Sequence, residues 1–268
     1  MPYITDNDEE VWNGLWQRTD ISIGFESALS IGFFCPGYAG GLEDYPNLAY
    51  RLNPKVDIHI VRSALEEDAH RPDNLRQVGN VDILLPAVQQ LKQRNVDAAT
   101  WACTSGSFVF GADGARQQCE ELSSALGRPV TSTSLAFVKA LEALDIRSVS
   151  IAASYPEDLA ELFANFISDN GYRVDQLRCL DIMTGVDVGR LSPEEIINFV
   201  VENTDPLSEA VLIPDTAMAT CRFLTELDNS IAGTVLTANQ VTLWDVLNLA
   251  GWEGSLSAGG TLFSSNQI

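Results

Sequence analysis

The stretch DAATWACTSGSFVFG at residues 97–111 decides the fold class of this chain. It begins with an apolar run of strand length, passes through the polar turn Cys103-Thr104-Ser105, and continues into residues with helical spacing. A buried strand that ends in small polar residues before a helix is the basic unit of α/β proteins with parallel sheets. We therefore expect a βα unit here, with Cys103 at the carboxyl end of its strand.

The rest of the chain repeats this alternation of short apolar runs and longer helical stretches. The apolar runs predict eight strands, at 29–35, 56–61, 97–102, 130–133, 148–153, 172–180, 209–213 and 234–238. The helical stretches between them include 81–94, 112–126, 135–144, 156–170, 193–202, 219–227 and 241–249. The sequence predicts an α/β fold built on parallel sheets.

An internal similarity indicates two pseudo-symmetric lobes. The run 97–105 ends a strand in a small polar turn before a helix, and the run 209–216 does the same. The boundaries we expect are an N-terminal extension at 1–28, a first lobe at 29–133 completed by 239–268, and a second lobe at 134–238. Because open α/β sheets bind ligands at the carboxyl ends of their strands, both turns are expected to face one active site between the lobes.

Composition and charge exclude several kinds of partner. The chain carries 37 acidic and 16 basic side chains, a formal net charge of −21 that repels nucleic-acid phosphates and anionic membrane surfaces. Its hydrophobic content of 46% is that of a folded protein, and its apolar runs are shorter than a membrane-spanning helix requires. We expect no nucleic-acid partner and no membrane partner.

The cysteines and the N-terminus give two weaker expectations. The five cysteines are odd in number, share no CxxC spacing and follow no signal peptide, so we expect reduced thiols in the cytoplasm. Near the N-terminus, Val11, Trp12, Leu15 and Trp16 share one helical face. Such a helix docks on the body of the protein or on a second subunit, and we expect a homo-oligomer.

Cys103 is the first candidate for chemistry. A thiol near a helix N-terminus has its pKa lowered by free amide donors, and the resulting thiolate can attack or take up a proton. The same donors can hold a carboxylate. A cysteine at a strand end is often only a core residue, but a purely structural position does not need the hydroxyls and the glycine of Cys-Thr-Ser-Gly-Ser around it.

Four segments together resemble the maleate isomerase and arylmalonate decarboxylase family of the Asp/Glu racemase superfamily. They are ACTSGSFVFG at 102–111, GRPVTSTSLAFVKALEALDI at 127–146, SVSIAASYPED at 148–158 and TANQVTLWDVLNLAG at 237–251. The resemblance implies two pseudo-symmetric flavodoxin-like (Rossmann-like) lobes with parallel sheets, an active site between them and no cofactor. It also implies a small carboxylate substrate, with one reactive cysteine from each lobe.

Several site residues are implied by position in this resemblance. Cys103 matches the first-lobe cysteine, and Thr104 and Ser105 follow it as carboxylate donors. Tyr155 matches the substrate-binding tyrosine of the family. The first strand's loop is represented by Pro36, Gly37 and Tyr38.

The second lobe departs from the family pattern. Asp215, followed by Thr216, stands 24 residues before Asn239, where the family has its second cysteine. A carboxylate can act there as general acid or base. Two alternatives stay open: Asp215 caps a helix that begins near Ala217, or Cys221, six residues further on, is the second reactive group.

Three functions are compatible with these residues. The first is a cofactor-independent isomerase or racemase that uses Cys103 with Asp215. The second is an arylmalonate-type decarboxylase with Cys103 as proton donor, and the third is a non-catalytic protein that binds carboxylates. Maleate as substrate is disfavoured, because glycine replaces asparagine in the 37–40 loop and at Gly185.

The other candidates are expected to be structural. We predict packing roles for His59, His70, Cys119 and Cys179. The chain has no metal-binding motif, and it has no glycine-rich phosphate-binding motif that would indicate a nucleotide cofactor.

Overall fold

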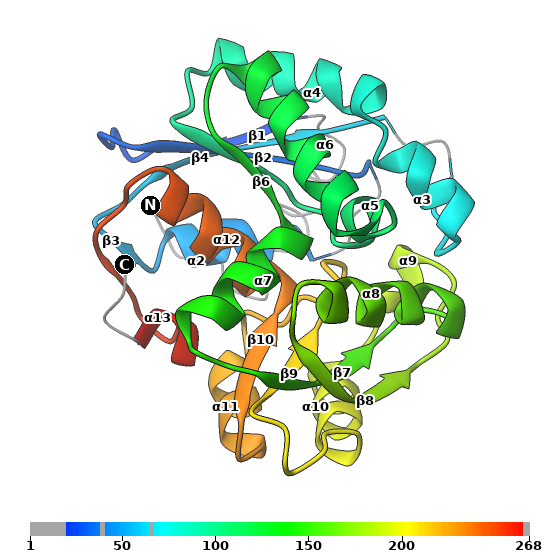
Figure 1. Cartoon of the computed structure of the whole chain (residues 1–268). Helices are drawn as coiled ribbons and strands as arrows, with labels where there is room; N and C mark the ends of the chain where they lie inside the picture. The colour runs from blue at the N-terminus through cyan, green and yellow to red at the C-terminus, as the bar shows by residue number, and fades with distance from the viewer. Residues whose placement is uncertain (1–19, 38–40, 65–66, 265–268) are drawn as a thin grey trace.

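A computed structural model describes residues 20–37, 41–64 and 67–264 of the chain. The first of its two large sheets is formed by the N-terminal half (Figure 1). In spatial order the sheet consists of β1 (Asp20–Ile23), β4 (Asp57–Arg62), β2 (Ser30–Cys35), β5 (Ala98–Trp101) and β6 (Val130–Ser132). The last four strands are parallel, and β1 pairs antiparallel with β4 at the edge.

The second sheet is parallel throughout. In spatial order it consists of β10 (Thr234–Thr237), β9 (Ala210–Ile213), β7 (Ser148–Ala153) and β8 (Arg173–Cys179). When the four parallel strands of each sheet are numbered in chain order, both sheets have the spatial order 2-1-3-4. This is the flavodoxin-like order, so the predicted pair of pseudo-symmetric lobes is confirmed.

All eight predicted strands are present, each within one residue of its predicted ends. The strands β5, β7 and β9 were recognisable because they are buried at every residue, so they consist of apolar residues with only small hydroxyl side chains among them. The edge strand β1 was not predicted and lies inside the segment 1–28 that we set apart as an extension. The helix expected around Trp12 and Trp16 lies outside the described residues.

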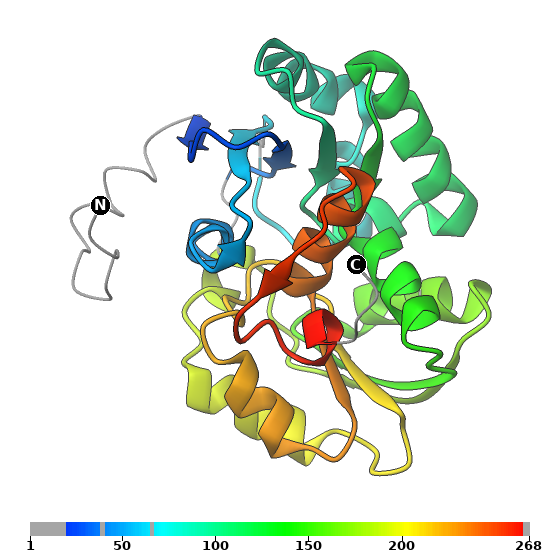
Figure 2. The same cartoon turned by 90° about the vertical axis from the view of Figure 1, so that its left-hand side faces the viewer.

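Helices cover the sheets and fill the space between them (Figures 1 and 2). The longer ones are α4 (Val81–Gln93), α6 (Gly111–Leu126), α7 (Thr133–Ala143), α8 (Glu157–Asp169), α10 (Pro193–Glu202) and α12 (Ala238–Leu249). The shorter ones are α2 (Asp44–Ala49), α3 (Pro72–Val78), α5 (Ser105–Phe108), α9 (Gly185–Val188), α11 (Leu224–Ser230) and α13 (Thr261–Ser264). A small antiparallel pair, β3 (Leu52–Asn53) with β11 (Ser255–Leu256), returns the C-terminal segment to the first lobe.

The helix predicted at 219–227 begins later than expected. The structure starts α11 at Leu224, and turns and bends occupy most of residues 216–223. Leu224 and Leu227 give the helical spacing that the sequence displays. The residues before them are held by hydrogen bonds with Asp44 and Asn239. This irregular segment directly follows Asp215.

Helices α7 and α12 join the two lobes. The chain crosses from β6 to β7 through α7, and α12 packs back against α7, β5 and β6. Their seam is polar as well as apolar, because Lys139 Nζ lies 2.9 Å from the buried Asp245 carboxylate. One buried apolar cluster contains residues of both sheets, including Phe33 and Leu212. This shared core fixes the strand ends of the lobes relative to each other.

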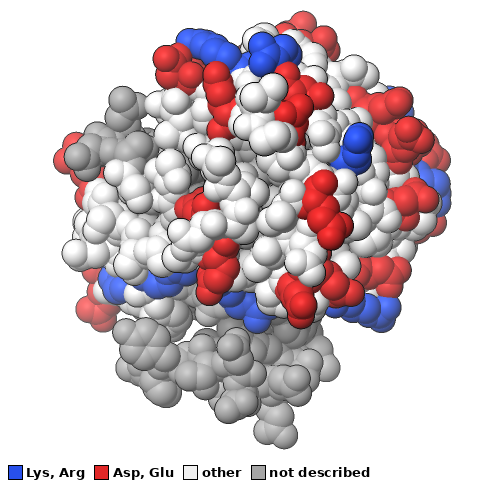
Figure 3. All heavy atoms as spheres, turned by 90° about the horizontal axis from the view of Figure 1, so that it is seen from below, with Lys and Arg blue, Asp and Glu red and all other residues white. Residues whose placement is uncertain are grey.

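The surface carries charges of both signs. On the face drawn in Figure 3, lysines and arginines lie beside acidic side chains and do not gather into a basic patch. No helix in the described part of the chain combines the length and the apolar character needed to cross a bilayer.

Candidate active site

A cavity lies at the carboxyl ends of strands from both sheets. It encloses about 470 Å³, including its open mouth. Its lining comes from the ends of β2, β5 and β9, from the loop between β4 and α3, from α3 itself and from the start of α9. Among the lining residues are Pro36, Glu67, Asp68, His70, Cys103, Ser105, Gly185, Asp215 and Thr216. The predicted position of the site, where strand ends of both lobes meet, agrees with this cavity.

Cys103 lies two residues beyond the end of β5, directly before α5. The Gly106 N–H donates a hydrogen bond to Sγ at 3.3 Å, and the Ser105 hydroxyl lies 3.8 Å from the same sulfur. A Cβ at Gly106 would lie only 3.2 Å from Sγ, so glycine lets the backbone approach the thiol. The Ser and Gly that follow Cys103 in the sequence therefore contact its sulfur.

The predicted lowering of the Cys103 pKa is wrong. Burial, with a smaller contribution from the charge of Asp215, raises the pKa of this thiol to about 11, because the hydrogen bonds from Gly106 and Ser105 offset only part of the increase. The side chain is 5% exposed, and α5 has only four residues, so loss of hydration outweighs the helix terminus. At neutral pH Cys103 is a protonated thiol.

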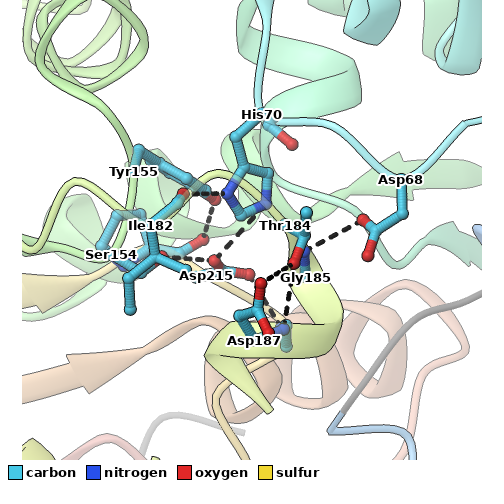
Figure 4. Close-up of polar contacts among 12 residues, drawn as sticks. Asp68, His70, Ser154, Tyr155, Ile182, Thr184, Gly185, Asp187 and Asp215 are labelled. Atoms are coloured by element: carbon cyan, nitrogen blue, oxygen red, sulfur yellow. Dashed lines mark hydrogen bonds and ion pairs between the residues drawn. The ribbon is translucent and has the colours of Figure 1, made fainter. Parts of the chain in front are cut away.

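Asp215 lies two residues beyond the end of β9, the position that Cys103 has relative to β5. The hydroxyl of Ser154 donates to Oδ2, and the Ala217 N–H donates to Oδ1 at 2.8 Å (Figure 4). Because α11 begins only at Leu224, the helix-cap alternative for Asp215 is wrong; the bond to Ala217 closes an Asx turn instead. The side chain is buried, and the residue lines the cavity.

His70 is a site residue that sequence reasoning missed. Its Nε2 lies 3.8 Å from Asp215 Oδ2, and its Nδ1 lies 2.8 Å from the Ile182 carbonyl oxygen (Figure 4). Since a carbonyl only accepts, Nδ1 carries a hydrogen, and Nε2 is left to exchange a proton with Asp215. No sequence motif surrounds His70; packing between the β4–α3 and β8–α9 loops puts it in the cavity. His59 is on β4, with Nδ1 2.8 Å from the Ser22 hydroxyl.

Two of the predicted substrate contacts lie behind the cavity wall. The Tyr155 hydroxyl donates to the Pro214 carbonyl at 3.0 Å, and its ring packs edge-on against His70 with centroids 5.1 Å apart. Thr104 is buried, and its carbonyl accepts from the Ser134 hydroxyl at 3.1 Å. Neither residue belongs to the lining described above.

The other residues predicted to contact substrate do not all line the cavity. Pro36, Ser105 and Thr216 line the cavity. Gly37 lies beside it, with its carbonyl accepting from Arg62 Nη1 at 2.5 Å. Tyr38 lies outside the described residues.

Cys221, the alternative second reactive group, is not among the cavity-lining residues. Its N–H donates to the buried Asp44 carboxylate at 3.1 Å, and burial followed by the charge of Asp44 raises its pKa well above the ordinary value. Asn239 fixes the neighbouring turn, because its Nδ2 lies 3.1 Å from the Thr216 carbonyl and 3.0 Å from Asp44 Oδ2. This network holds the segment after Asp215 against the first lobe.

The family model of arylmalonate decarboxylase matches residues 35–263, which include both strand-end turns and the whole second sheet. This chain belongs to the arylmalonate decarboxylase family.

Relatives of this family member include both enzymes that the sequence resembled. Arylmalonate decarboxylase of Bordetella bronchiseptica is 25% identical over 244 residues, covering 90% of this chain and 98% of the relative. Maleate isomerase of Pseudomonas putida is 25% identical over 181 residues, covering 65% of this chain and 72% of the relative. The crystal structure of maleate isomerase from Pseudomonas putida S16 matches with a TM-score of 0.82 at 20% identity, covering 89% of this chain and 99% of that one.

The cavity of this family member is lined by two candidate reactive groups of unequal chemistry, the Cys103 thiol and the Asp215 carboxylate. A thiol that stays protonated at neutral pH can give a proton, and a carboxylate beside an imidazole can take one. The arrangement is therefore suited to proton transfer at a carbon held between the lobes.

Proposed function

We propose that this protein is a cofactor-independent isomerase of the racemase type, acting on a small carboxylate. The observation that carries the proposal is the matched placement of Cys103 and Asp215, each two residues beyond the third parallel strand of its lobe and both on one cavity. Inversion at a carbon needs an acid and a base on opposite faces. Two equivalent strand ends of a pseudo-symmetric fold supply such opposed groups.

The reaction begins with Asp215 as the base. Asp215 removes the proton from the carbon next to the substrate carboxylate, and the electrons of the C–H bond pass into the carboxylate to form an enediolate. Cys103 then gives its S–H proton to the opposite face of the same carbon, and the enediolate electrons form the new C–H bond. The enzyme is left with a Cys103 thiolate and a protonated Asp215, which is the starting state for the reverse reaction.

The first-lobe turn is suited to hold the negative charge that develops. The Ser105 hydroxyl and the Gly106 N–H already contact Sγ, so a carboxylate seated near the thiol would find donors there. Thr216, from the second-lobe turn, lines the same cavity. The family resemblance also implies this role for Pro36, which lines the cavity, whereas Thr104 and Tyr155 lie behind its wall and support it from there.

His70 gives Asp215 a way to return its proton. With Nδ1–H bonded to the Ile182 carbonyl, Nε2 can accept the proton that Asp215 has taken from the substrate. Asp215 and His70 thus form a pair through which the second lobe resets between turnovers.

A decarboxylase is the second candidate, and the protonated state of Cys103 favours it. If a carboxylate leaves as carbon dioxide, its bonding electrons form the enediolate of the remaining acid, and the thiol protonates it from one face only. The family model and the Bordetella bronchiseptica relative are both arylmalonate decarboxylases, which also supports this alternative. In this reading Asp215 takes no proton from carbon.

One assay distinguishes these functions. The protein is incubated in D₂O with single enantiomers of 2-substituted monocarboxylates and with 2-aryl malonates, while deuterium at the α carbon, enantiomeric composition and carbon dioxide are followed. A racemase incorporates deuterium with loss of optical purity and no gas. A decarboxylase releases carbon dioxide and gives one enantiomer in excess. Binding without either reaction in wild type would overturn both and leave the carboxylate-binding alternative.

Assembly and location belong to the same proposal. We expect a homo-oligomer in the cytoplasm, in keeping with five free cysteines in the structure. Light scattering coupled to size-exclusion chromatography, on the full chain and on a chain lacking residues 1–19, tests whether the Trp-bearing segment contributes to assembly.

A further inference from the structure

We propose that Asp68 restricts this active site to substrates with a single carboxylate. The inference names the substrate class of the proposed function and therefore rests on it. The names of the relatives indicate dicarboxylate substrates instead, since malonates and maleate both carry two carboxylates.

Asp68 extends from the loop after β4 to the start of α9 in the other lobe (Figure 4). Its Oδ1 accepts from the Gly185 N–H at 3.0 Å, and its Oδ2 accepts from the Val186 N–H at 2.9 Å. Both oxygens are thus used as acceptors, as in a carboxylate anion. The amide donors on this side of the cavity are already occupied by an anion of the protein itself.

The loop that carries Asp68 is anchored independently of that contact. The His70 N–H donates to the Met183 carbonyl at 2.8 Å, and the His70 ring bonds to the Ile182 carbonyl at 2.8 Å. The loop and the β8–α9 segment are therefore joined at His70 as well as through the Asp68 carboxylate. Asp68 is held at the cavity rather than swung out into solvent.

The charges around the cavity oppose a second substrate carboxylate. Three acidic residues line it, namely Glu67, Asp68 and Asp215, and its described lining contains no lysine or arginine. Arg71 sits outside the lining and bonds to both oxygens of Glu67 at 3.0 Å. In a partly buried site, like charges a few ångströms apart repel strongly. His70 is the one lining side chain among the described residues that can carry a positive charge, and it faces Asp215.

The rest of this wall suits an uncharged substituent. Pro36, Leu75, Val78 and Ala217 line the cavity, and Leu75 and Val78 are buried in the protein without ligand. A substrate that places its carboxylate near Cys103 and Ser105 would turn its other groups toward Asp68 and these apolar side chains. A monocarboxylate with an apolar or neutral substituent matches that lining.

The test compares acids that differ by one carboxylate. Dissociation constants of phenylacetate and phenylmalonate, and of butyrate and succinate, are measured by calorimetry on the full chain, in wild type and in Asp68→Asn. We expect wild type to bind each monocarboxylate at least tenfold more tightly than its dicarboxylate partner. Asp68→Asn keeps an acceptor for one amide but removes the charge, so it should reduce this preference at least tenfold, mainly through tighter binding of the dicarboxylate.

Asp187→Asn is the matched control. Asp187 lies on α9, the short helix that Asp68 contacts, bonds to Thr184 and Arg190, and is not among the cavity-lining residues. Removing its charge should therefore leave the preference for monocarboxylates within twofold of the wild-type value. Thermal unfolding establishes that both variants are folded. The proposal is overturned if wild type binds the dicarboxylates as tightly as the monocarboxylates or more tightly. It is also overturned if Asp68→Asn weakens the binding of both kinds of acid equally. Failure of wild type to bind any of these acids up to about 10 mM, a concentration at which even weak ligands bind, overturns it too.

The role of Asp68 and the proposed function can fail independently of each other. If monocarboxylates are preferred but none exchanges its α hydrogen, the proposed function fails while the role of Asp68 stands. If dicarboxylates are turned over and Asp68→Asn leaves their binding unchanged, the role of Asp68 fails while the enzymatic proposal stands.

Discussion

The turns that follow β5 and β9 are equivalent in topology but different in chemistry. Each places a candidate reactive residue two positions beyond the strand, with a threonine next in sequence, as Cys103-Thr104 and Asp215-Thr216. The first turn runs directly into a helix, whereas the second passes through an irregular segment before α11. Pseudo-symmetry therefore fixes where the two groups lie, and the local sequence and its partners fix what each can do.

The partners of the two groups explain their different roles. The Cys103 sulfur is buried with weak donors around it, so its pKa rises to about 11 and it holds its proton. Asp215 receives bonds from Ser154 and Ala217 and faces His70. In the proposed reaction, Cys103 is the proton donor and Asp215 the proton acceptor, at equivalent places in the two lobes. Substitutions at four positions test this comparison.

Removal of the thiol should have the largest effect. Cys103→Ala and Cys103→Ser leave no group able to protonate the first face, and we expect turnover to fall by about 10³-fold or more. The measurement is α-deuterium exchange, or carbon dioxide release, on the best substrate. Cys119→Ser is the control, because Cys119 is equally buried but lies on α6. Full activity in Cys103→Ser would remove the basis of the comparison.

Asp215→Asn should follow, with a loss of about 10²-fold to 10³-fold as expected for a general base. The same variant tests the coupling between the lobes. Because the charge of Asp215 raises the pKa of Cys103, its removal should move the pH profile of Cys103 alkylation by iodoacetamide to lower pH. Peptide mass spectrometry separates Cys103 from the other cysteines. A profile that stays in place would mean that the two turns do not interact.

His70→Gln sharpens the role of the second lobe. Glutamine can place a polar atom near Asp215 but cannot take up a proton, so we expect kcat to fall about tenfold while KM stays within twofold. His59→Gln is the matched control at the other histidine, which lies on β4 and bonds to Ser22. A rise in KM with kcat unchanged would make His70 a binding residue instead.

Cys221→Ser should have the smallest effect, less than twofold on turnover. Cys221 is buried against Asp44 and Arg51, away from the described lining of the cavity. Kinetics are compared after thermal unfolding confirms that the variant is folded. A loss of more than about tenfold in a folded variant would move the second reactive group from Asp215 to Cys221 and break the symmetry argued above.

Prediction of the fold succeeded where local pattern and packing agree. Strands such as β7 and β9 are buried at every residue, so the sequence shows them as runs of apolar residues with, in β7, only small serines among them. The edge strand β1 escaped because its four residues alternate and pair at one side only. The start of α11 was misjudged because Asn239 and Asp44, distant in sequence, hold the preceding residues in turns.

The sequence by itself determined the fold class, the repeat of the two lobes and the two strand-end positions, since each depends on residues close along the chain. The tertiary structure decided which further groups reach the cavity and which state they are in. His70 and Asp68 enter it because the β4–α3 loop bonds across to the segment before α9, a contact without a local signature. Likewise, a helix start beside Cys103 predicts a lowered pKa, but burial by residues far along the chain reverses the sign.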